Sequence, residues 1–345
     1  MKRHLPALAL PMKAIERTNN SFHALTMGSM ARWYCTEHTR GNVLASVTKC
    51  LYLSLEEGNI FWLVGQEGSL HSRCIQIEGC LPALDAGVSF TLSQDHILFS
   101  DGTNVDLTGC STWQAALLDE KSLQPASQIY PRAEIVFQIL SGFSPRGFGI
   151  IIPSLLHEDH ISLSGSGFQL KDSILLLAAP HILEIARGSR CKRLDICLKA
   201  ADCLVGLGSG LTPSGDDFLG GMLFTLHVLG KAYPGQFQDD PSLITSFMKT
   251  SETKTNQISF TLMRDMSRGY GPAPLHQFMN SLLSGQPHDV IMESALELVK
   301  IGNSTGWDIL TGVFAGLKRG HLPIEQIQRP KVNDIPRKRE EIHGY

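Results

Sequence analysis

The sequence predicts an α+β protein in which a β-rich N-terminal part, a meander or a small barrel, precedes a mostly helical C-terminal domain. Short segments that alternate polar and apolar residues occupy positions 42–110, and turn residues separate them. Longer apolar segments of helical length begin at about residue 130. Strands that come first and helices that come later are typical of α+β folds rather than of alternating α/β folds.

Several short strands account for the β-rich part. A segment rich in Val and Leu is followed by the turn sequence EEGN, and HSRCIQI further along alternates in character. Short strands at regular spacing with turns between them favour a meander or a small barrel. The expected strands are 42–55, 60–64, 71–77, 88–92 and 96–99.

Helices are expected after the strands, where Gly, Pro and Asn separate apolar segments of suitable length. Between the early helices, residues 147–170 are expected to be extended, with a turn at Gly165-Ser166-Gly167. The expected helices are 134–140, 181–187, 194–205, 216–229, 253–267, 274–284, 290–301 and 308–317.

A change of composition near residues 112–130 divides the chain. A length of 345 residues agrees with about two domains. The expected segments are an N-terminal extension (1–41), a β-rich domain (42–125), a helical ligand-binding domain (126–325) and a polar tail (326–345).

The composition is that of an ordinary globular protein. Hydrophobic residues make up 43% of the chain, charged residues 18%, and the formal net charge is −3. Because this charge is small, no nucleic-acid or membrane partner is expected. The eight cysteines contain no CxxC pair, and no secretory signal or apolar stretch of membrane-spanning length is evident. A cytoplasmic location with reduced thiols is therefore expected.

The segment GLGSGLTPSGDDFLGG at residues 206–221 is the strongest functional signal. Closely spaced glycines allow backbone conformations in which successive N–H groups form a concave anion site. Pro213 suits a first helical turn, and the helix that begins here points its positive end at the loop. We therefore expect a small anion at this helix start. The expected anion-binding residues are Gly208, Ser209, Gly210, Thr212, Ser214 and Gly215.

Known nucleotide signatures do not fit this segment. Gly210 and Gly215 have the spacing of a P-loop, but Asp216 stands where that loop requires Lys. The glycines also read GxGxG rather than GxGxxG. A standard P-loop and a dinucleotide-binding loop are therefore not expected here.

The two carboxylates at Asp216 and Asp217 allow three interpretations. Asp217 can cap the helix, since Ser214-x-x-Asp217 has the form of a loose capping box. The pair can hold Mg²⁺ that bridges to phosphate. A carboxylate can also accept hydrogen bonds from an amide NH₂ of the substrate. We expect Asp217 to cap and Asp216 to face the ligand.

A short internal repeat extends the candidate site. SGDDFLGG at 214–221 aligns without gaps with TGWDILTG at 305–312. The two helix starts are therefore expected to open on one pocket, although simple capping of the second helix is the alternative. A polar run at 253–259 can contribute hydroxyls to this site, and a solvated helix start is the alternative. The residues added to the site are Thr255, Asn303, Ser304, Thr305, Gly306 and Asp308.

These segments resemble the DUF2877 family. Residues 208–221 match its form GxGLTPSGDDFLxG, and 305–312 match its later helix start, which is similar to SGxDxLxG. Residues 255–259 match a Thr-rich helix start, with Asn256 where Thr is expected. The resemblance covers about residues 40–320.

The resemblance implies a subunit of oxamate carbamoyltransferase, which acts in anaerobic allantoin degradation, a route of purine catabolism. The reaction converts oxalurate and phosphate to oxamate and carbamoyl phosphate. Its partners are a subunit similar to acyl-CoA synthetases and one of another uncharacterised family.

The sequence thus leads to two functional hypotheses. The first is a carbamoyltransferase-like subunit that binds a small carboxylate or carbamoyl substrate and phosphate, is active in a complex, and uses Asp216, Asp217 and Asp308 as catalytic residues. No cofactor is certain, and Mg²⁺ held by Asp216 and Asp217 is the one candidate. The second is a non-catalytic subunit that binds a small carboxylate or serves as a scaffold.

Overall fold

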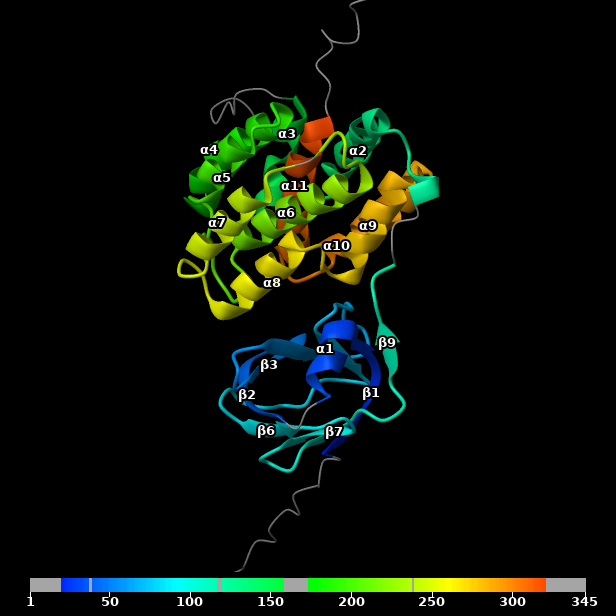
Figure 1. The fold of residues 1–345 in the computed structure, drawn as a ribbon, viewed down its shortest axis with the longest axis vertical. Coiled ribbons are helices and arrows are strands. Elements are labelled where there is room, and N and C mark those ends of the chain that lie inside the picture. The colour runs from blue at the N-terminus through cyan, green and yellow to red at the C-terminus, as the bar shows by residue number, and fades with distance from the viewer. Residues whose placement is uncertain (1–19, 37–38, 117–119, 158–172, 238, 321–345) are drawn as a thin grey trace, which may run out of the picture. The chain divides into compact units, whose positions relative to one another are not determined.

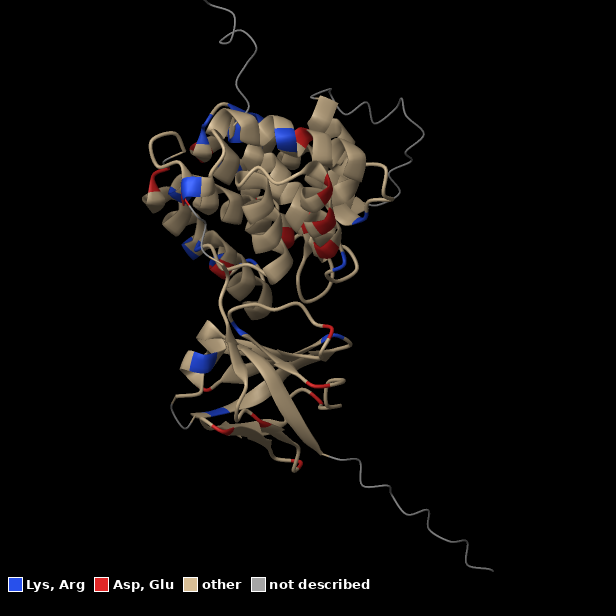
Figure 2. Ribbon diagram, turned by 90° about the vertical axis from the view of Figure 1, so that its right-hand side faces the viewer, with Lys and Arg blue, Asp and Glu red and all other residues tan. Residues whose placement is uncertain are grey.

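The computed structural model describes residues 20–36, 39–116, 120–157, 173–237 and 239–320. The chain forms two compact units, Met1–Trp113 and Gln114–Tyr345, and each is described by itself. The first is built from strands and the second from helices (Figure 1). The predicted α+β class, with β structure first, is therefore confirmed. Acidic and basic residues are distributed over both units, in keeping with the small net charge (Figure 2).

The β unit is a sheet that closes on itself. Its strand order is β5-β4-β3-β2-β6-β7-β8-β1-β9, and β1 also pairs with β5. That extra pairing closes a barrel, with β9 attached in parallel beside β1. Closure leaves the barrel strands without free edges. The strands are β1 (Ser21–Gly28), β2 (Thr39–Val47), β3 (Cys50–Leu55), β4 (Ile60–Val64), β5 (Cys74–Ile77), β6 (Ser89–Leu92), β7 (His96–Phe99), β8 (Asn104–Asp106) and β9 (Ser111–Trp113).

Alternation explains why these segments form barrel strands. In β3 and β7 every second residue is buried, so one face of each strand fills the barrel. The interior contains aromatic pairs such as Phe61 with Phe90, whose ring centroids are 5.9 Å apart. The apolar residues whose alternation predicted these strands are therefore the residues that are buried.

The first strand and helix lie in the segment that we expected to be an N-terminal extension. β1 and α1 (Ser29–Tyr34) belong to the β unit, and β1 contacts three other strands. The burial of β1 does not alternate regularly, which is why its sequence gave no clear strand signal. Gly28 is required at its end, because a Cβ there would overlap the backbone carbonyl of His71.

The helical unit surrounds two buried helices. α6 and α11 lie in its middle, and the other helices pack around them (Figure 1). Both helices are buried on all sides, as their continuous apolar sequences require. The helices are α2 (Ala126–Leu140), α3 (Ile152–His157), α4 (Ser173–Arg190), α5 (Leu194–Ala201), α6 (Ser214–Ala232), α7 (Pro241–Ser251), α8 (Gln257–Ser267), α9 (Ala273–Leu283), α10 (His288–Val299) and α11 (Thr305–Leu317).

α6 and α11 cross with their backbones in contact, and they do so symmetrically. A Cβ at Gly221 would overlap the carbonyl of Ile309, and a Cβ at Gly312 would overlap the carbonyl of Phe218. In the sequence repeat, Gly221 corresponds to Gly312 and Phe218 to Ile309. The repeat is therefore a local two-fold arrangement of two helix starts.

Prolines explain two helices that begin earlier than predicted. α2 and α4 each start eight residues before the segments expected at 134–140 and 181–187. Pro131 and Pro180 lie inside these helices. Each expected helix began after its proline, whereas the structure keeps the turns before the proline helical as well. α7 was not expected, although Asp240 caps it and Pro241 occupies its first turn.

The expectation of an extended segment at 147–170 is wrong where the structure describes it. Residues Gly147–Ile151 form a 3-10 helix, η2, and α3 follows directly. Phe148, Ile151, Ile152 and Leu155 are buried, and their spacing is helical rather than alternating. The turn expected at 165–167 lies outside the described residues. Within the described part of the chain, no helix is long and apolar enough to cross a membrane.

Candidate functional site

The starts of α6, α8 and α11 converge. The hydroxyls of Thr212 and Thr305 are 3.3 Å apart, so the two halves of the repeat meet at their N-terminal ends. Asp216 of α6 accepts a hydrogen bond of 2.6 Å from Ser259 of α8. We call this region the helix-start cluster and define it as residues 206–217, 255–259, 303–308 and 146–148. The helix starts at Ser214 and Thr305 thus lie together, with Thr255 near them.

The glycine loop before α6 offers backbone donors. Gly206, Gly208 and Gly210 have φ values of 73°, 134° and 94°, which L side chains rarely adopt. Successive N–H groups in such a loop form a site for an oxyanion. Among the described residues no acceptor is found for the backbone N–H groups of Gly208, Ser209, Gly210, Leu211 and Thr212.

Several glycines of the motif serve packing rather than ligand access. A Cβ at Gly206 would overlap the carbonyl of Lys254, and one at Gly208 would lie 2.6 Å from the amide nitrogen of Ser214. Gly215 and Gly306, which correspond in the repeat, each lie against a preceding backbone carbonyl. Only Gly210 among the three loop glycines has open space where a Cβ would be.

Asp216 holds the cluster together. One carboxylate oxygen accepts a 2.7 Å hydrogen bond from the N–H of Gly206, and the other accepts from the hydroxyls of Thr255 and Ser259. The side chain is 1% exposed. The carboxylate therefore joins α6 to the loop and to α8, and the expectation that Asp216 faces the ligand stays a prediction.

Replacing Asp216 with Asn should lower the free energy of unfolding by roughly 2–3 kcal/mol, because hydrogen bonds to a charged acceptor are lost and an amide NH₂ would face hydroxyl donors. Urea unfolding followed by circular dichroism measures this change. Asp289→Asn is the control, since Asp289 is exposed. Equal midpoints for the two variants would contradict the structural role of Asp216.

Neither aspartate caps a helix. α6 has Pro213 as its N-cap and α11 has Ser304, and in both cases no side chain accepts a capping hydrogen bond. The capping-box interpretation of Asp217 is therefore wrong, and so is the same interpretation of Asp308. Only α8 of the three helices is capped by a side chain, because Asn256 accepts from the N–H of Ser259 at 3.0 Å. Its amide also donates to the carbonyl of Leu211 and so holds the glycine loop.

Asp217 and Asp308 correspond in the repeat and form a buried carboxyl pair. They are 3% and 0% exposed, and Oδ2 of each accepts no hydrogen bond from the described residues. Their surroundings are reciprocal: the hydroxyl of Thr305 lies near Asp217, and that of Ser214 lies near Asp308. An unpartnered carboxyl oxygen in such a position costs free energy unless a proton or a ligand satisfies it.

Burial governs the protonation of this pair. Desolvation, and then the negative charge of Asp308, raise the pKa of Asp217 well above its ordinary value. Desolvation raises the pKa of Asp308 to about 6, against the hydrogen bond that it accepts from the N–H of Phe148 at 2.6 Å. Both carboxyls therefore keep a proton up to a higher pH than an exposed aspartate does, and the two titrate as a pair.

The raised pKa of Asp308 predicts a pH dependence of stability. The folded state holds the proton of Asp308 up to a higher pH than the unfolded state does. Asp308 therefore makes its full contribution to the free energy of unfolding below about pH 4, and this contribution is lost as the pH rises through about 6. Relative to Asp308→Asn, the wild type should lose up to about 3 kcal/mol over this range. Urea unfolding of both proteins between pH 4 and 8 measures the difference. A difference that does not change with pH would contradict the burial of an ionisable group here.

The segment Arg146–Phe148 belongs to the cluster, although it was not expected from the sequence. The N–H of Phe148 reaches Asp308 because Gly147 has a φ of 53° and no side chain, and a Cβ there would overlap the carboxylate. Arg146 donates to the side chain of Asn303 at 3.0 Å and brings a positive charge to the cluster. The sequence Pro-Arg-Gly-Phe-Gly, with two glycines beside an arginine, is the signal that could have identified it.

Within the described residues, no group of three or more His, Cys, Asp or Glu side chains could hold a metal ion. A divalent cation in the cluster would therefore depend on Asp217 and Asp308 and on oxygens from the ligand or from water. Asp216, which we expected to hold Mg²⁺ with Asp217, already accepts hydrogen bonds on both of its oxygens.

Comparison with known proteins agrees with the resemblance expected from the sequence. The family described as oxamate carbamoyltransferase subunit AllH matches residues 204–317, which is about one third of the chain. The match contains the glycine loop, α6, α8 and α11, and it does not include Arg146 to Phe148. Neither the curated proteins nor the solved structures contain a significant match. Over the residues that build most of the helix-start cluster, the chain is thus similar to the oxamate carbamoyltransferase subunit AllH family.

Proposed function

We propose that the chain is a subunit of an enzyme that transfers a carbamoyl group between an amide and phosphate, and that the helix-start cluster binds the carbamoyl-bearing substrate. The family match over residues 204–317 supports the class of reaction. The observation that carries the proposal is the buried pair Asp217 and Asp308, whose Oδ2 atoms have no partner among the described residues and lie beside a loop rich in N–H donors.

In the phosphorolysis of oxalurate, an oxygen of hydrogen phosphate forms a bond to the carbamoyl carbon. The bond between that carbon and the oxamate nitrogen breaks, and the nitrogen takes a proton. The phosphate loses its proton in the same reaction. A single side chain can therefore donate a proton to the nitrogen and accept one from the phosphate. Asp217 is suited to this role because burial raises its pKa and so favours the protonated form.

The remaining groups would bind and orient the substrate. The ionised carboxylate of Asp308 can accept hydrogen bonds from the carbamoyl NH₂. The loop N–H groups and the positive ends of α6 and α11 favour phosphate or a substrate carboxylate. Arg146 adds a cation beside Asn303, where a second anionic group could bind.

Mg²⁺ is the alternative occupant of the carboxyl pair. Asp217 and Asp308 would hold it, and it would stabilise negative charge on a bound phosphate. In that arrangement Asp217 would be ionised, so the two arrangements differ in the proton that it carries.

Ligand-induced thermal stabilisation tests the proposal. Oxalurate, oxamate, carbamoyl phosphate and phosphate are compared with chloride at equal ionic strength, with and without Mg²⁺. A ligand at about 100 times its Kd stabilises the native state by about 2.7 kcal/mol, which corresponds to a rise of a few degrees in Tm. A rise that requires Mg²⁺ favours the metal arrangement, and a rise without metal favours direct recognition.

Thr305→Val should remove this rise, because the Thr305 hydroxyl lies 3.3 Å from that of Thr212 and close to Asp217. Thr245→Val is the matched control, since its hydroxyl donates to the carbonyl of Pro241 on α7. Gly208→Val is not a suitable probe, because its side chain would overlap the backbone at Ser214. If no ligand raises the Tm of the wild type, the binding proposal is wrong.

The proposal includes partner subunits, one similar to acyl-CoA synthetases and one of another family, in the cytoplasm. The isolated chain should then be weakly active or inactive, and co-expression should restore turnover. If the chain binds the ligand but replacement of Asp217 leaves the rate of the complex unchanged, the chain is a non-catalytic carboxylate-binding subunit.

A further inference from the structure

We propose that Arg146 binds the carboxylate of the carbamoyl donor and so selects donors that carry an acid group close to the carbamoyl nitrogen. This inference rests on the proposed function and assigns the two anions of the reaction to different helix starts. The donor carboxylate binds at α11, beside Arg146, and phosphate binds at the glycine loop before α6. A donor whose acid group is replaced by a neutral group would then bind weakly.

Arg146 is the one cation of the helix-start cluster. The four segments that define the cluster contain three aspartates and no other Lys or Arg. Lys254, which precedes one of these segments, already pairs with Asp202 at 2.5 Å. A carboxylate that enters among aspartates is repelled unless a cation compensates its charge, and Arg146 supplies that cation.

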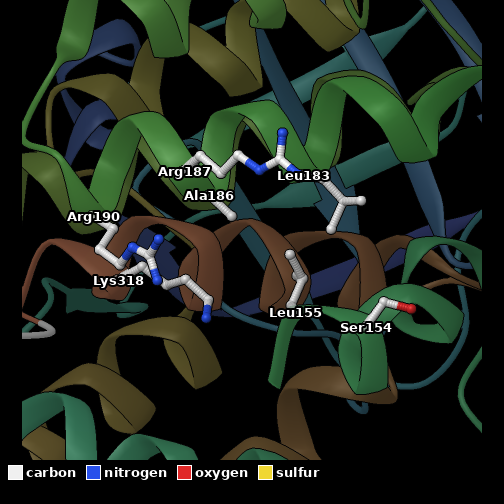
Figure 3. Close-up of a pocket in the computed structure, with 7 residues that line it drawn as sticks. All are labelled: Ser154, Leu155, Leu183, Ala186, Arg187, Arg190 and Lys318. Atoms are coloured by element: carbon white, nitrogen blue, oxygen red, sulfur yellow. The ribbon is translucent and has the colours of Figure 1, made fainter. Parts of the chain in front are cut away.

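Three further cations of the helical unit lie away from the cluster. Arg187, Arg190 and Lys318 line a cavity between α4 and the residues that follow α11 (Figure 3). Lys318 follows the last residue of α11, whereas the helix-start cluster contains its first turn. The 13 residues of α11 span about 20 Å, so Lys318 is too far from the cluster to bind the same small ligand.

The guanidinium of Arg146 is held in place, yet it keeps donors free. It donates to the side-chain oxygen of Asn303 at 3.0 Å, and among the described residues it has no other partner. A guanidinium has several N–H donors in a planar fork, and a carboxylate binds to such a fork through both of its oxygens. Asn303 therefore fixes the side chain, while other donors of the fork remain available to a carboxylate.

The start of α11 adds backbone donors near this guanidinium. The N–H groups of Thr305 and Trp307 have no acceptor among the described residues. In α6, by contrast, the N–H of Asp216, which corresponds to Trp307, donates to the carbonyl of Pro213 at 2.9 Å. The free donors of α11 and the positive end of its dipole favour a negative group next to Arg146.

The buried carboxyl of Asp308 can hold the carbamoyl group beside this acid site. Gly147, the residue after Arg146, lies so close to Asp308 that a Cβ would overlap its carboxylate. Oδ2 of Asp308 has no hydrogen-bond partner among the described residues. The carbamoyl NH₂ can donate to that oxygen, so a donor whose acid group is only a few bonds from its carbamoyl group can reach both Asp308 and Arg146.

The glycine loop is left for phosphate. The successive N–H groups from Gly208 to Thr212 have no acceptor among the described residues. A concave set of N–H groups suits a tetrahedral oxyanion, whereas the planar fork of Arg146 suits a planar carboxylate. Replacing Arg146 should therefore weaken the binding of the donor and leave the binding of phosphate.

Thermal titration of the full chain with oxalurate, with the neutral ethyl ester of oxalurate and with phosphate tests the inference. The Kd of each ligand follows from the rise in Tm with its concentration. Arg146→Gln should raise the Kd of oxalurate by about tenfold or more, and should change the Kd of the ester and of phosphate by less than about twofold.

Two further variants complete the test. Arg146→Lys keeps the charge but not the planar fork, so it should restore part of the affinity for oxalurate. Arg193→Gln is the control, because Arg193 is exposed and pairs with Asp195 at 2.6 Å.

An equal loss of binding for all three ligands in Arg146→Gln would mean that Arg146 only supports the fold of the cluster, and would overturn the inference. Unchanged binding of oxalurate, or a loss confined to phosphate, would overturn it as well. In each of these cases oxalurate still stabilises the wild type, so the proposed function stands. If no ligand stabilises the wild type, the proposed function is wrong, and this inference is wrong with it.

Discussion

Asp217→Asn should reduce carbamoyl transfer by the assembled complex by about 10²–10⁴-fold, the usual contribution of a positioned acid or base. Asn cannot give a proton to the leaving nitrogen, although it has the same size and an oxygen at the same place. Because a carboxyl with an unpartnered buried oxygen is replaced by a neutral amide, the Tm should not fall. The phosphorolysis rate of oxalurate, measured with partner subunits present, gives the effect on kcat.

Asp308→Asn should act differently on the same reaction. If Asp308 binds the carbamoyl NH₂, its loss should raise KM as well as lower kcat, whereas Asp217→Asn should act mainly on kcat. Asp289→Asn, at an exposed position of α10, is the control for both. Full turnover by both variants would contradict any catalytic role of the pair, and would leave ligand binding as the only function of the cluster.

Gly312→Ala should destabilise the helical unit by about 3 kcal/mol or more. The added Cβ would overlap the carbonyl oxygen of Phe218 and lie 2.9 Å from the amide nitrogen of Met222, so α6 and α11 would have to separate along their crossing. Because both contacts are with backbone, no rotamer change relieves them. Urea unfolding followed by helical ellipticity measures the loss.

Gly230→Ala is the matched control for this prediction. Gly230 lies inside α6, and a Cβ there would meet only the carbonyl of Phe237, at 3.4 Å. An alanine in a helix interior should stabilise by about 0.5–1 kcal/mol where space allows. If Gly312→Ala were as stable as Gly230→Ala, the close crossing of the two helices would be wrong.

Periodicity predicted much of the fold, because burial in this chain follows it. β3, β4, β6 and β7 occur within the expected strands, since their apolar residues alternate or run continuously. β5 is shorter than the expected strand at 71–77, because His71 and Arg73 are buried in the turn before it. Local pattern could not show that this turn is packed inside the fold.

The sequence also predicted that the segments at Ser214, Thr255 and Thr305 meet at the cluster, but it predicted neither the part played by residues 146–148 nor which way the side chains point. The repeat indicated that the helix starts at Ser214 and Thr305 share a role, and they lie together. Asp216 and Asp217 are neighbours on α6 and point about 100° apart. Which of them faces α8 and which faces α11 depends on how the helices dock, and no local pattern contains that information.

The two-fold arrangement of α6 and α11 has a consequence for specificity. A ligand on the local axis meets nearly the same chemistry from either side, since Asp217 with Thr305 mirrors Asp308 with Ser214. A symmetric site of this kind cannot by itself distinguish the two ends of a ligand. The direction in which a substrate lies must come from residues without a counterpart: Trp307, which occupies the position of Asp216 in the second copy, and the Arg146–Phe148 segment beside Asp308.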